Sequence, residues 1–579
     1  MNKTMKKKNI KKVKVKTTTF NAFYFSSLLV SSYVIVAFGQ PVWVGWLGYF
    51  AAFFGYALFW RAICFFKSKG MRFSLATLWF ASVHGVGLSW MTETHYHGYF
   101  IVFVYLFLLL GVGVQFGLLS LLIVKRKSFT FLQMLAIASV WTIFEWLRLF
   151  FLSGYTWNPV GMALAANNIT VQIASLFGIY GMSFWVILVN TMSFKVLFVE
   201  RNIKLCATWC SLMIFPFIFG TVHFFMHKDK IDKEEFYSVV LVQTALLPEQ
   251  KDPISNYDCC FISPVVQWER ILHFINDSGQ NKIDLIVFPE SVVPFGARQT
   301  FYPIDSVMRI WENVFGKESI QSFPVLRYPL ANKNEKKQWF VSNTFWAQAL
   351  ANYYETEVVI GLEDADAILK KNYNAAFFLQ PFGFEAKRYK KQILVPIGEY
   401  FPFSWCKTIA AKFGISGQFT PGKDTKVFFG QKLPFGISIC YEETYGDLIR
   451  KNRLKGARLF VNITNDVWFP NSTLPQQHYE LGRLRAIENG IPIIRACNTG
   501  VTVAVDSLGR IVKKMKGPDC KIEEIAGAMH VKVPLHHFPT LYTLAGDKFI
   551  LTLSFIFIGL FIKKEPKKFF YYINNNFKL

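Results

Sequence analysis

Charged residues are scarce in this sequence, and acidic residues are scarcer than basic ones. Asp, Glu, Lys and Arg together make up 17% of the 579 residues, whereas a soluble globular protein usually carries about 25%. Hydrophobic residues reach 52%, aromatic residues 17%, and the mean hydropathy is +0.28. This composition excludes a disordered chain and a small disulfide-rich scaffold. It predicts a membrane protein, much of whose surface faces lipid.

The sequence also lacks metal-binding spacings and internal repeats. Its nine cysteines contain no CxxC pair and form no His/Cys cluster with the spacing of metal ligands, so we expect no metal site. Six of them follow residue 228, where an oxidising compartment would leave their disulfide state open. These are Cys259, Cys260, Cys406, Cys440, Cys497 and Cys520.

The net charge of +25 comes from basic residues clustered beside apolar runs. Eight lysines fall within the first 16 residues, and Lys563, Lys564, Lys567 and Lys568 follow the last apolar run. Such clustering is typical of membrane topology rather than of a phosphate-binding face. We therefore expect no nucleic-acid partner.

Eight apolar runs have about the length, roughly 20 residues, that crosses a hydrocarbon core. They cover residues 20–38, 42–66, 73–90, 99–124, 129–152, 182–199, 205–226 and 546–562. Loops 67–72, 125–127 and 200–204 are basic, whereas loops 91–98 and 153–168 contain no Lys or Arg. Because positive residues stay on the cytoplasmic side, both termini should be cytoplasmic and residues 228–545 should lie outside.

The outer domain alternates expected strands with expected helices. The whole chain then divides into a basic N-terminus (1–19), a seven-span bundle (20–227), the outer domain (228–545), an eighth span (546–562) and a basic tail (563–579). Strands are predicted at 236–243, 284–289, 357–362, 374–380, 435–440, 458–464, 491–496 and 501–505, and helices at 258–277 and 475–489. A hairpin turn is expected at 506–509, and a long loop at 294–345. This alternation favours an α/β layered sandwich.

Three segments of this domain end an apolar strand in a reactive residue. Glu290 follows the strand at 284–289, Lys390 and Lys391 precede another apolar run, and Cys440 ends the strand at 435–440. Each is weak evidence alone, since most such residues are solvated, ion-paired or simply packed. Together they suit nucleophilic catalysis, in which a carboxylate takes the thiol proton and a lysine stabilises thiolate and oxyanion.

In this order, Glu290, Lys391 and Cys440 resemble the Glu–Lys–Cys triad of the nitrilase (carbon–nitrogen hydrolase) superfamily. Nearly the whole chain is similar to the apolipoprotein N-acyltransferase family, membrane-bound members of that superfamily. The matching segments are Phe144-Glu145-Trp146-Leu147-Arg148, Gly154-Tyr155-Thr156-Trp157, Leu394-Val395-Pro396-Ile397-Gly398-Glu399, Ile439-Cys440-Tyr441-Glu442, Asn465-Asp466-Val467-Trp468-Phe469, Gln477-His478, Arg483, Arg485-Ala486-Ile487-Glu488, Thr540-Leu541-Tyr542 and Gly546-Asp547.

The resemblance implies a nitrilase-like α-β-β-α sandwich on the periplasmic side of the bacterial inner membrane. It also implies an N-acyltransferase, acting last in lipoprotein maturation, that moves an acyl chain through a thioester. The donor would be the sn-1 ester of a phospholipid, typically phosphatidylethanolamine. The acceptor would be the α-amino group of a diacylglyceryl-Cys on an apolipoprotein. No metal or organic cofactor would be needed, and the enzyme should be monomeric.

The resemblance also assigns roles to six residues. Cys440 would be the nucleophile, Glu290 the general base and Lys391 the oxyanion stabiliser, preferred to Lys390 because of its spacing from Glu399. Glu399 would orient the lysine and the reacting amine. Tyr441 and Glu442 would shape the site, with the Tyr441 N–H as a plausible oxyanion donor.

The chain departs from the family pattern in two places. Thr244-Ala245 stands where the family usually has Gly-Asn, and the stretch between Glu290 and Glu357 is longer than usual. The aromatic residues of 294–345 are as readily an entrance for acyl chains as part of a core; they are Phe295, Phe301, Tyr302, Trp311 and Trp339. Glu145 and Arg148, one turn apart near a span end, are expected to pair with each other rather than to bind substrate.

Two other functions are compatible with parts of the sequence. A membrane-anchored nitrilase-like amidase would share the triad, but a hydrolase of soluble amides needs no eight-span bundle. A transporter or receptor with a ligand-binding outer domain would not need a Glu–Lys–Cys set. The acyltransferase therefore remains the preferred hypothesis.

Overall fold

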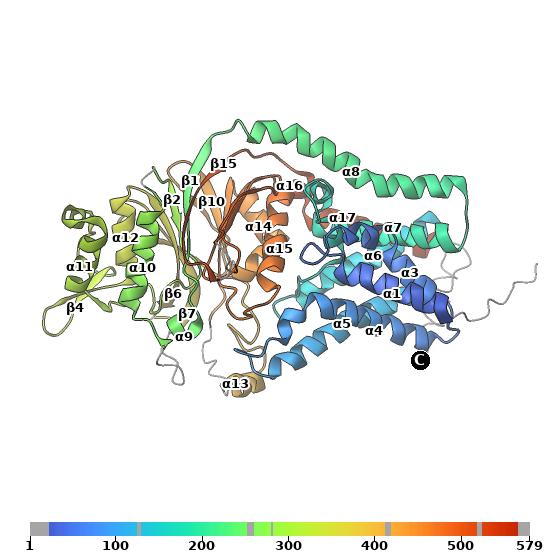
Figure 1. Cartoon of the computed structure of the whole chain (residues 1–579), viewed down its shortest axis with the longest axis horizontal. Coiled ribbons are helices and arrows are strands. Elements are labelled where there is room, and N and C mark those ends of the chain that lie inside the picture. The colour runs from blue at the N-terminus through green and yellow to red at the C-terminus, as the bar shows by residue number, and fades with distance from the viewer. Residues whose placement is uncertain are drawn as a thin grey trace, which may run out of the picture.

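The computed structural model describes residues 22–123, 129–251, 260–279, 282–366, 368–411, 419–517, 521 and 524–564. A bundle of apolar helices and a layered α/β domain lie end to end (Figure 1). The chain passes between them at α8 (Ile203–Ile231) and returns to the bundle in α17 (Asp547–Lys564). The basic segments 1–19, 125–127 and 565–579 lie outside the described residues, as do Cys259, Cys520 and the side chain of Cys406.

Each expected apolar run coincides with a helix or with consecutive helical segments. Besides α8 and α17 these are α1 (Ala22–Phe38), α2 (Leu47–Phe50) continuing through η1 (Ala51–Gly55) into α3 (Tyr56–Ile63), α4 (Lys69–Gly87), α5 (Phe100–Ile123), α6 (Phe131–Leu147) and α7 (Ala174–Phe198). Four described helical stretches are long and apolar enough to cross a membrane: Phe100–Ile123, Phe131–Phe150, Thr170–Phe198 and Ile203–Ile231.

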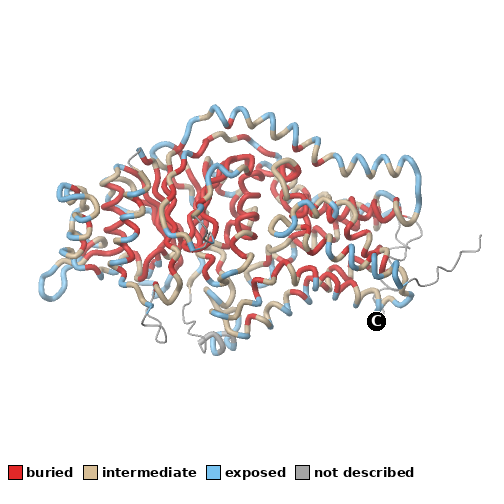
Figure 2. The backbone as a smooth tube through the Cα atoms, viewed as in Figure 1, coloured by how far each residue is buried: buried red, intermediate tan, exposed pale blue. Residues whose placement is uncertain are grey.

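Helix α7 lies at the centre of the bundle and α8 at its edge. The most apolar part of Thr170–Phe198 is 83% buried, whereas that of α8 is 11% buried. Figure 2 shows the same contrast, since α8 is exposed or half-exposed along most of its length. Because most α8 side chains are apolar and unburied by protein, this helix needs a lipid-like surrounding.

The α/β domain is built on two six-stranded sheets. The first has the order β15-β1-β2-β6-β7-β8 and the second β14-β13-β12-β11-β10-β9. Their strands are β1 (Phe236–Gln243), β2 (Leu285–Val287), β6 (Glu357–Asp366), β7 (Lys371–Leu379), β8 (Lys387–Lys390), β9 (Val427–Phe429), β10 (Pro434–Ile439), β11 (Leu459–Thr464), β12 (Ile493–Cys497), β13 (Val503–Val505), β14 (Ile511–Lys514) and β15 (Gly527–Pro534). All eight predicted strands are present within a few residues of their expected bounds.

The two sheets pack face to face, and helices cover their outer faces. Along β1, Val239 and Leu241 point into the core between the sheets, whereas Val240 and Val242 point outward, as the two-residue period of a strand requires. Helices α10 (Pro264–Asp277) and α12 (Asn343–Tyr353) cover the first sheet, and α14 (Gly446–Leu454) and α15 (Leu474–Asn489) cover the second (Figure 1). The predicted layered sandwich is therefore confirmed as an α-β-β-α arrangement. The predicted hairpin turn is also present, because Gly509 N donates to Asp506 O between β13 and β14.

The prediction of a long loop at 294–345 is wrong. This segment contains β3 (Tyr302–Pro303), α11 (Ile304–Phe315), η7 (Lys317–Ser322), β4 (Ala331–Lys333) and β5 (Trp339–Val341). Tyr302 and Trp311 are fully buried in the core under the first sheet, and α11 and β4 lie at the end of the molecule opposite the bundle (Figure 1). For these two aromatics the core interpretation is therefore confirmed.

Helix α15 joins the α/β domain to the bundle. Four of its apolar side chains belong to the core of the bundle: Leu474, Leu481, Leu484 and Ile487. Polar contacts fix it further, since Gln477 Nε2 donates to Gly87 O at 2.6 Å and Arg483 Nη2 to Ala165 O at 2.7 Å. The two parts are thus held by a packed interface rather than by a linker.

A kink in α7 forms part of this junction. Gly178 has φ 64° and ψ −170°, so the helix is interrupted there. A Cβ at Gly178 would lie 2.3 Å from the Tyr542 ring, which explains why only glycine fits. The Ile179 N–H beyond the interruption donates to Glu488 Oε1 of α15 at 3.0 Å, so a carboxylate of the α/β domain caps a bundle helix.

Candidate active site

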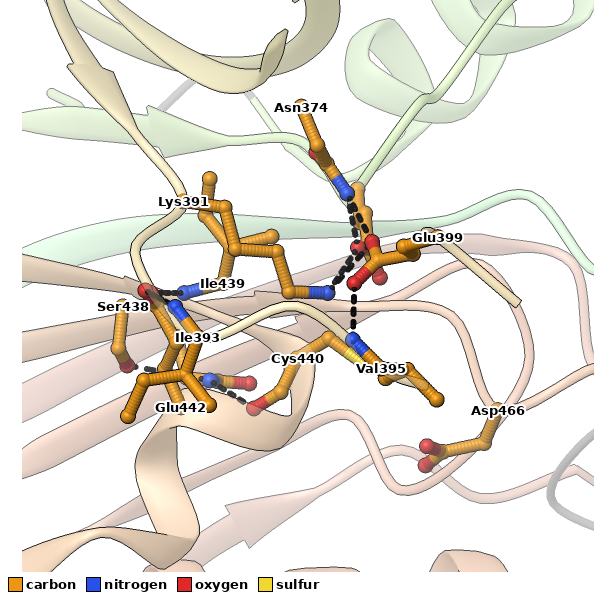
Figure 3. Close-up of polar contacts among 12 residues, drawn as sticks. Asn374, Lys391, Ile393, Val395, Glu399, Ser438, Ile439, Cys440, Glu442 and Asp466 are labelled. Carbon is orange, nitrogen blue, oxygen red and sulfur yellow. Dashed lines mark hydrogen bonds and ion pairs between the residues drawn. The ribbon is translucent and has the colours of Figure 1, made fainter. Parts of the chain in front are cut away.

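The sheets bring the three sequence-predicted residues together at one edge. Glu290 follows β2, Lys391 follows β8, and Cys440 follows β10. Glu290 and Lys391 are buried, and Cys440 is half-buried. Figure 3 shows the Cys440 side chain beside that of Lys391. Because β2 and β8 belong to one sheet and β10 to the other, the site forms at the seam between them.

Lys391 lies between two carboxylates. Its Nζ is 3.1 Å from Glu290 Oε1 and 2.9 Å from Glu399 Oε1. Lys390 faces the other way, with its Nζ 3.3 Å from the centre of the Tyr373 ring. Successive residues of a strand point to opposite faces, so only one of the two lysines can enter the site.

Asn374 on β7 links the same two carboxylates, a residue that the sequence analysis did not single out. Its Nδ2 donates to Glu290 Oε1 at 2.7 Å and to Glu399 Oε1 at 2.9 Å (Figure 3). Glu399 Oε2 in turn accepts from Val395 N at 2.8 Å. Each carboxylate is therefore fixed by at least two donors, which leaves it little freedom to rotate.

Backbone geometry places Glu290 and Cys440 accurately. A Cβ at Gly361 on β6 would lie 2.5 Å from Pro289 O and 2.7 Å from Glu290 Cα, so this glycine allows the Glu290 backbone to approach the sheet. Cys440 itself has φ 53°, a left-handed conformation that is uncommon for a non-glycine residue and concentrates at functional sites. The turn that it opens, η8 (Cys440–Thr444), directs the thiol into the seam.

The charges around Cys440 favour a protonated thiol and a protonated lysine. Burial and the nearby Glu290 carboxylate raise the pKa of the Cys440 thiol well above its usual value, and Lys391 offsets only part of this. Burial alone would lower the pKa of Lys391, but Glu290, Glu399 and Cys440 together raise it well above its usual value. The resting thiol therefore needs a base to react, and Lys391 remains a cation.

Glu442 holds the loop that follows Lys391. Its Oε1 accepts from Gln392 N at 2.5 Å and from Ile393 N at 3.2 Å, and its Oε2 accepts from Ile439 N at 2.8 Å. Tyr389 Oη donates to both carboxylate oxygens. Burial raises the pKa of Glu442 to about 7, against the opposing effect of these backbone N–H groups. Glu442 thus connects the two strands that carry Lys391 and Cys440.

Tyr441 ties the nucleophile turn to the bundle. Its Oη donates to Gly154 O at 3.1 Å, and its ring stacks on Trp157 with centroids 5.9 Å apart. Both partners belong to the loop after α6. A residue next to Cys440 is therefore in direct contact with a loop of the helical bundle.

A buried network of four ionisable side chains lies behind the turn that Cys440 opens. His478 Nδ1 is 2.8 Å from Asp466 Oδ1, and its Nε2 is 3.1 Å from Glu443 Oε1. Arg495 binds the same two carboxylates, with Nε 2.8 Å from Glu443 Oε1 and Nη2 3.3 Å from Asp466 Oδ2. The sequence analysis matched Asp466 and His478 to the family but gave them no role. Their place on different elements explains why spacing alone could not reveal it.

The expected ion pair between Glu145 and Arg148 is not formed. Neither residue takes part in an ion pair within 4.0 Å among the described residues. Instead, Glu145 Oε1 accepts from Trp141 Nε1 at 2.9 Å and from Val160 N at 3.0 Å. Arg148 Nε donates to Gln115 Oε1 at 2.8 Å. Glu145 lies on the last turn of α6 and Arg148 just beyond it, so their side chains diverge to different neutral partners.

Two family models match the chain. The one described as apolipoprotein N-acyltransferase N-terminal domain matches residues 34–192, and the one described as carbon-nitrogen hydrolase matches residues 265–521. The apolipoprotein N-acyltransferase of Chlamydia caviae is 33% identical over 544 residues, which cover 91% of this chain and 95% of that protein. That of Chlamydia pneumoniae is 33% identical over 549 residues, with 91% and 95% covered. Among solved structures, Saccharomyces cerevisiae Nit3 of the nitrilase superfamily is 17% identical, covers 54% of this chain and 93% of its own, and has a TM-score of 0.35.

The sandwich, the Glu–Lys–Cys seam and the carbon-nitrogen hydrolase match define a membrane-associated member of the carbon–nitrogen hydrolase class. The relatives at 33% identity extend this likeness through the bundle as well. The chain therefore belongs to the apolipoprotein N-acyltransferase family, and the resemblance found in the sequence is confirmed. It is an acyltransferase and a bacterial membrane protein.

Proposed function

We propose that Cys440, Glu290 and Lys391 carry out a two-step acyl transfer from a phospholipid to an apolipoprotein. The observation that carries this proposal is the position of Lys391 Nζ, which lies within 3.1 Å of both Glu290 and Glu399 beside Cys440. A neutral thiol next to a carboxylate base and a fixed cation is suited to attack on an ester carbonyl. Glu399 and Asn374 hold the base and the cation in position.

In the first step the Cys440 sulfur attacks the sn-1 ester carbonyl of the phospholipid. Glu290 takes the thiol proton as the S–C bond forms, and Lys391 stabilises the oxyanion, together with the Tyr441 N–H. The tetrahedral intermediate then collapses, the ester C–O bond breaks, and Glu290 gives its proton to the departing glycerol oxygen. A lysophospholipid leaves, and Cys440 carries the acyl group as a thioester.

In the second step the α-amino group of a diacylglyceryl-Cys attacks the thioester. The N–C bond forms and the C–S bond breaks, while Glu290 takes a proton from the amine and returns it to the sulfur. Glu399 orients the amine alongside Lys391. The products are an N-acylated apolipoprotein and the free thiol. Every proton and the acyl group are thus accounted for without a cofactor.

The same proposal places eight spans in the inner membrane, with both termini cytoplasmic and the catalytic domain periplasmic. Its support is the pattern of basic and uncharged loops together with the lipid-like surroundings that α8 requires. The proposed bounds are those of the sequence analysis, with the seven-span bundle at 20–227 and the catalytic domain at 228–545. The end of α8 at Ile231 and the start of the first strand at Phe236 support a boundary close to that position. Phosphatidylethanolamine is the proposed donor, and a monomer the proposed state.

The test is transfer to a synthetic diacylglyceryl peptide with phosphatidylethanolamine as donor. Wild type should yield N-acylated peptide, whereas Cys440→Ala, Glu290→Gln and Lys391→Met should yield none. Release of free fatty acid in place of acylated peptide would instead identify the membrane-anchored amidase. Asn372→Ala, an exposed change on the same strand as Asn374, should transfer as wild type does.

A further inference from the structure

Two adjoining hollows on the surface of the α/β domain are rich in cations. One has a volume of about 610 Å³ and the other of about 220 Å³. Both are lined by Arg388 and Lys426, so they form one continuous groove, which we call the basic groove. Its six cations are Arg298, Lys387, Arg388, Lys390, Lys423 and Lys426.

The positive charge of the basic groove is not balanced. The buried carboxylate of Asp364 lies 2.8 Å from Arg388 Nη1 and 4.0 Å from Lys390 Nζ. Two exposed acids, Glu385 and Asp424, also line the groove. Six cations against these three carboxylates leave a net charge of +3. The other four cations, which are Arg298, Lys387, Lys423 and Lys426, form no ion pair within 4.0 Å with any residue that the structure describes.

One end of the basic groove lies next to the active site. Lys390 lines the groove, and the following residue is Lys391, whose side chain points to the other side of the same strand. The groove wall at 423–426 continues a segment that also starts at the site, because Phe419 N donates to Glu399 O at 2.9 Å and Gly422 N to Lys391 O at 2.7 Å. Since β8 is the edge strand of its sheet, a chain that leaves the site over this edge enters the groove.

The basic groove leads from the site away from the bundle. On the bundle side of Glu399, α13 (Ser404–Ala411) lies beside the start of α5 (Figure 1), where the Trp405 and Phe100 rings are 6.4 Å apart. The other end of β8 follows a turn in which the Phe384 ring lies 5.0 Å from the Arg327 guanidinium. Arg327 stands between η7 and β4, in the part of the domain opposite the bundle. The order along this side of the domain is therefore bundle, active site, groove.

Both walls of the basic groove are sheet edges. β8 is the last strand of the first sheet, and β9 is the last strand of the second. An edge strand offers unpaired backbone groups that an extended chain can join. The four residues of β8 match about four residues of such a chain. Lysines along the edge repel a basic chain and attract a chain that carries carboxylates.

We propose that the basic groove binds an acidic, extended segment of the acceptor polypeptide, a few residues after its diacylglyceryl-Cys. The proposal rests on the proposed function in one respect, that an apolipoprotein is the acyl acceptor. The acyl chains of this acceptor stay with the bundle and its amine reaches Cys440, so its polypeptide must leave the site in the direction of the groove. The groove thus selects among acceptors by their charge and takes no part in the chemistry.

The test varies the charge of the acceptor and of the basic groove together. Three diacylglyceryl peptides that differ only at about residues 3–6, with Glu, Ser or Lys there, would be offered to full-length enzyme in nanodiscs of zwitterionic lipid. Thioester formation is measured first, and transfer is then expressed per acyl-enzyme. Wild type should transfer to the Glu peptide roughly tenfold faster than to the Lys peptide at limiting peptide, since several weak ion pairs act together. In 1 M NaCl most of this difference should disappear, because the Debye length falls to about 3 Å.

Lys387→Glu combined with Lys426→Glu should reverse the preference, so that the Lys peptide becomes the better acceptor. The matched control is Lys317→Glu combined with Lys336→Glu, which makes the same change in net charge at exposed lysines of η7 and the β4–β5 turn. The control should keep the wild-type preference. An equal effect of both pairs would assign the preference to the overall charge of the chain and overturn the proposal. No charge preference in wild type would also overturn it, and the lysines would then serve only to keep the edge strands from pairing.

Binding can be measured without the chemistry. A fluorescent Glu peptide should bind Cys440→Ala, and adding the Lys387→Glu and Lys426→Glu changes should raise its dissociation constant roughly tenfold. A benzophenone side chain at residue 5 of this peptide should crosslink to 387–390 or 423–426. Undiminished binding, or crosslinks only to other segments, would contradict the groove as the binding surface. If wild type formed no thioester, the fault would lie with the catalytic assignment, because binding to Cys440→Ala is independent of it.

Discussion

Glu290 and Lys391 exert opposite electrostatic effects on the same thiol. The carboxylate raises the pKa of Cys440 and the ammonium lowers it, with burial adding to the carboxylate's effect. Together these effects favour the protonated thiol in the absence of substrate.

Glu290→Gln should separate acidity from catalysis. The Glu290 carboxylate charge raises the pKa of Cys440, so its removal should lower that pKa and make the thiol more acidic. Acylation should nevertheless be lost, because the variant has no base. The Cys440 pKa can be followed by the pH dependence of alkylation with iodoacetamide, with Cys440→Ala as the blank. An unchanged or higher pKa would contradict the proposed charge arrangement.

Asn374→Ala tests whether the carboxylates must be held in place. Glu290 and Glu399 would each lose a donor, so we expect acylation to fall at least tenfold and the free energy of unfolding to drop by about 1–3 kcal/mol. Initial rates of thioester formation and urea unfolding measure the two effects. Asn372→Ala on the same strand is the control, and equal activity of the two variants would show that Asn374 is dispensable.

The convergence of Glu290, Lys391 and Cys440 was predictable from the sequence, whereas that of Asn374 was not. Glu290, Lys391 and Cys440 each stand in a recognisable segment at the end of a strand. Asn374 lies inside β7, where an isolated amide gives no signal. Its importance depends on the register that brings β7 beside β8, and on the loop that returns Glu399 to the same place.

At the scale of elements, α15 connects the helical bundle to the turn that carries Cys440. One face packs in the core of the bundle, and another carries His478, which binds Glu443 and Asp466 behind the nucleophile turn. Arg495 on β12 also binds these two carboxylates and offsets their negative charge. A buried charge without its partner is costly, so the four side chains stabilise the turn only as a set.

Arg495→Met should therefore be strongly destabilising. It leaves the two buried carboxylates without the guanidinium that binds both of them, and we expect a loss of about 3–5 kcal/mol in the free energy of unfolding. Lys432→Met, which removes an exposed partner of Asp284, should cost less than about 1 kcal/mol. Chemical denaturation in detergent compares the two. A similar small cost for both would mean that the network contributes little to stability.

The strands and the apolar helices were predictable as elements because they are continuous apolar runs. The segment 294–345 was mistaken for a loop because its strands are only two or three residues long and the β4–β5 hairpin carries exposed charges. Helix α11 has just two fully buried side chains, Val307 and Trp311. Such short elements are stabilised by tertiary packing, which one sequence does not reveal.

At the scale of the whole molecule, the packed junction fixes the α/β domain relative to the helical bundle. The loop after α6 contacts Tyr441, and α15 caps α7. Both substrates carry acyl chains, and each buried CH₂ contributes roughly 0.8 kcal/mol to membrane anchoring. A rigid junction allows a site in an aqueous domain to meet substrates that never leave the bilayer. None of these contacts could be predicted from the sequence, because each joins residues from distant parts of the chain.

Cysteine labelling of spheroplasts checks the orientation. Glu335→Cys, exposed near the β4–β5 turn, should react with a membrane-impermeant maleimide, and Lys67→Cys, exposed before α4, should react only after lysis. Wild type labelled in parallel gives the background from native cysteines. Reaction of Lys67→Cys in intact spheroplasts, with Glu335→Cys protected, would reverse the proposed topology.

The central claim is that Cys440 carries the acyl group between donor and acceptor. Intact-protein mass spectrometry after incubation with phosphatidylethanolamine tests it most directly, with wild type beside Cys440→Ala. Wild type should gain the mass of one acyl chain, hydroxylamine should remove it, and Cys440→Ala should gain nothing. An unmodified wild type in a folded state, or the same adduct on Cys440→Ala, would contradict the account.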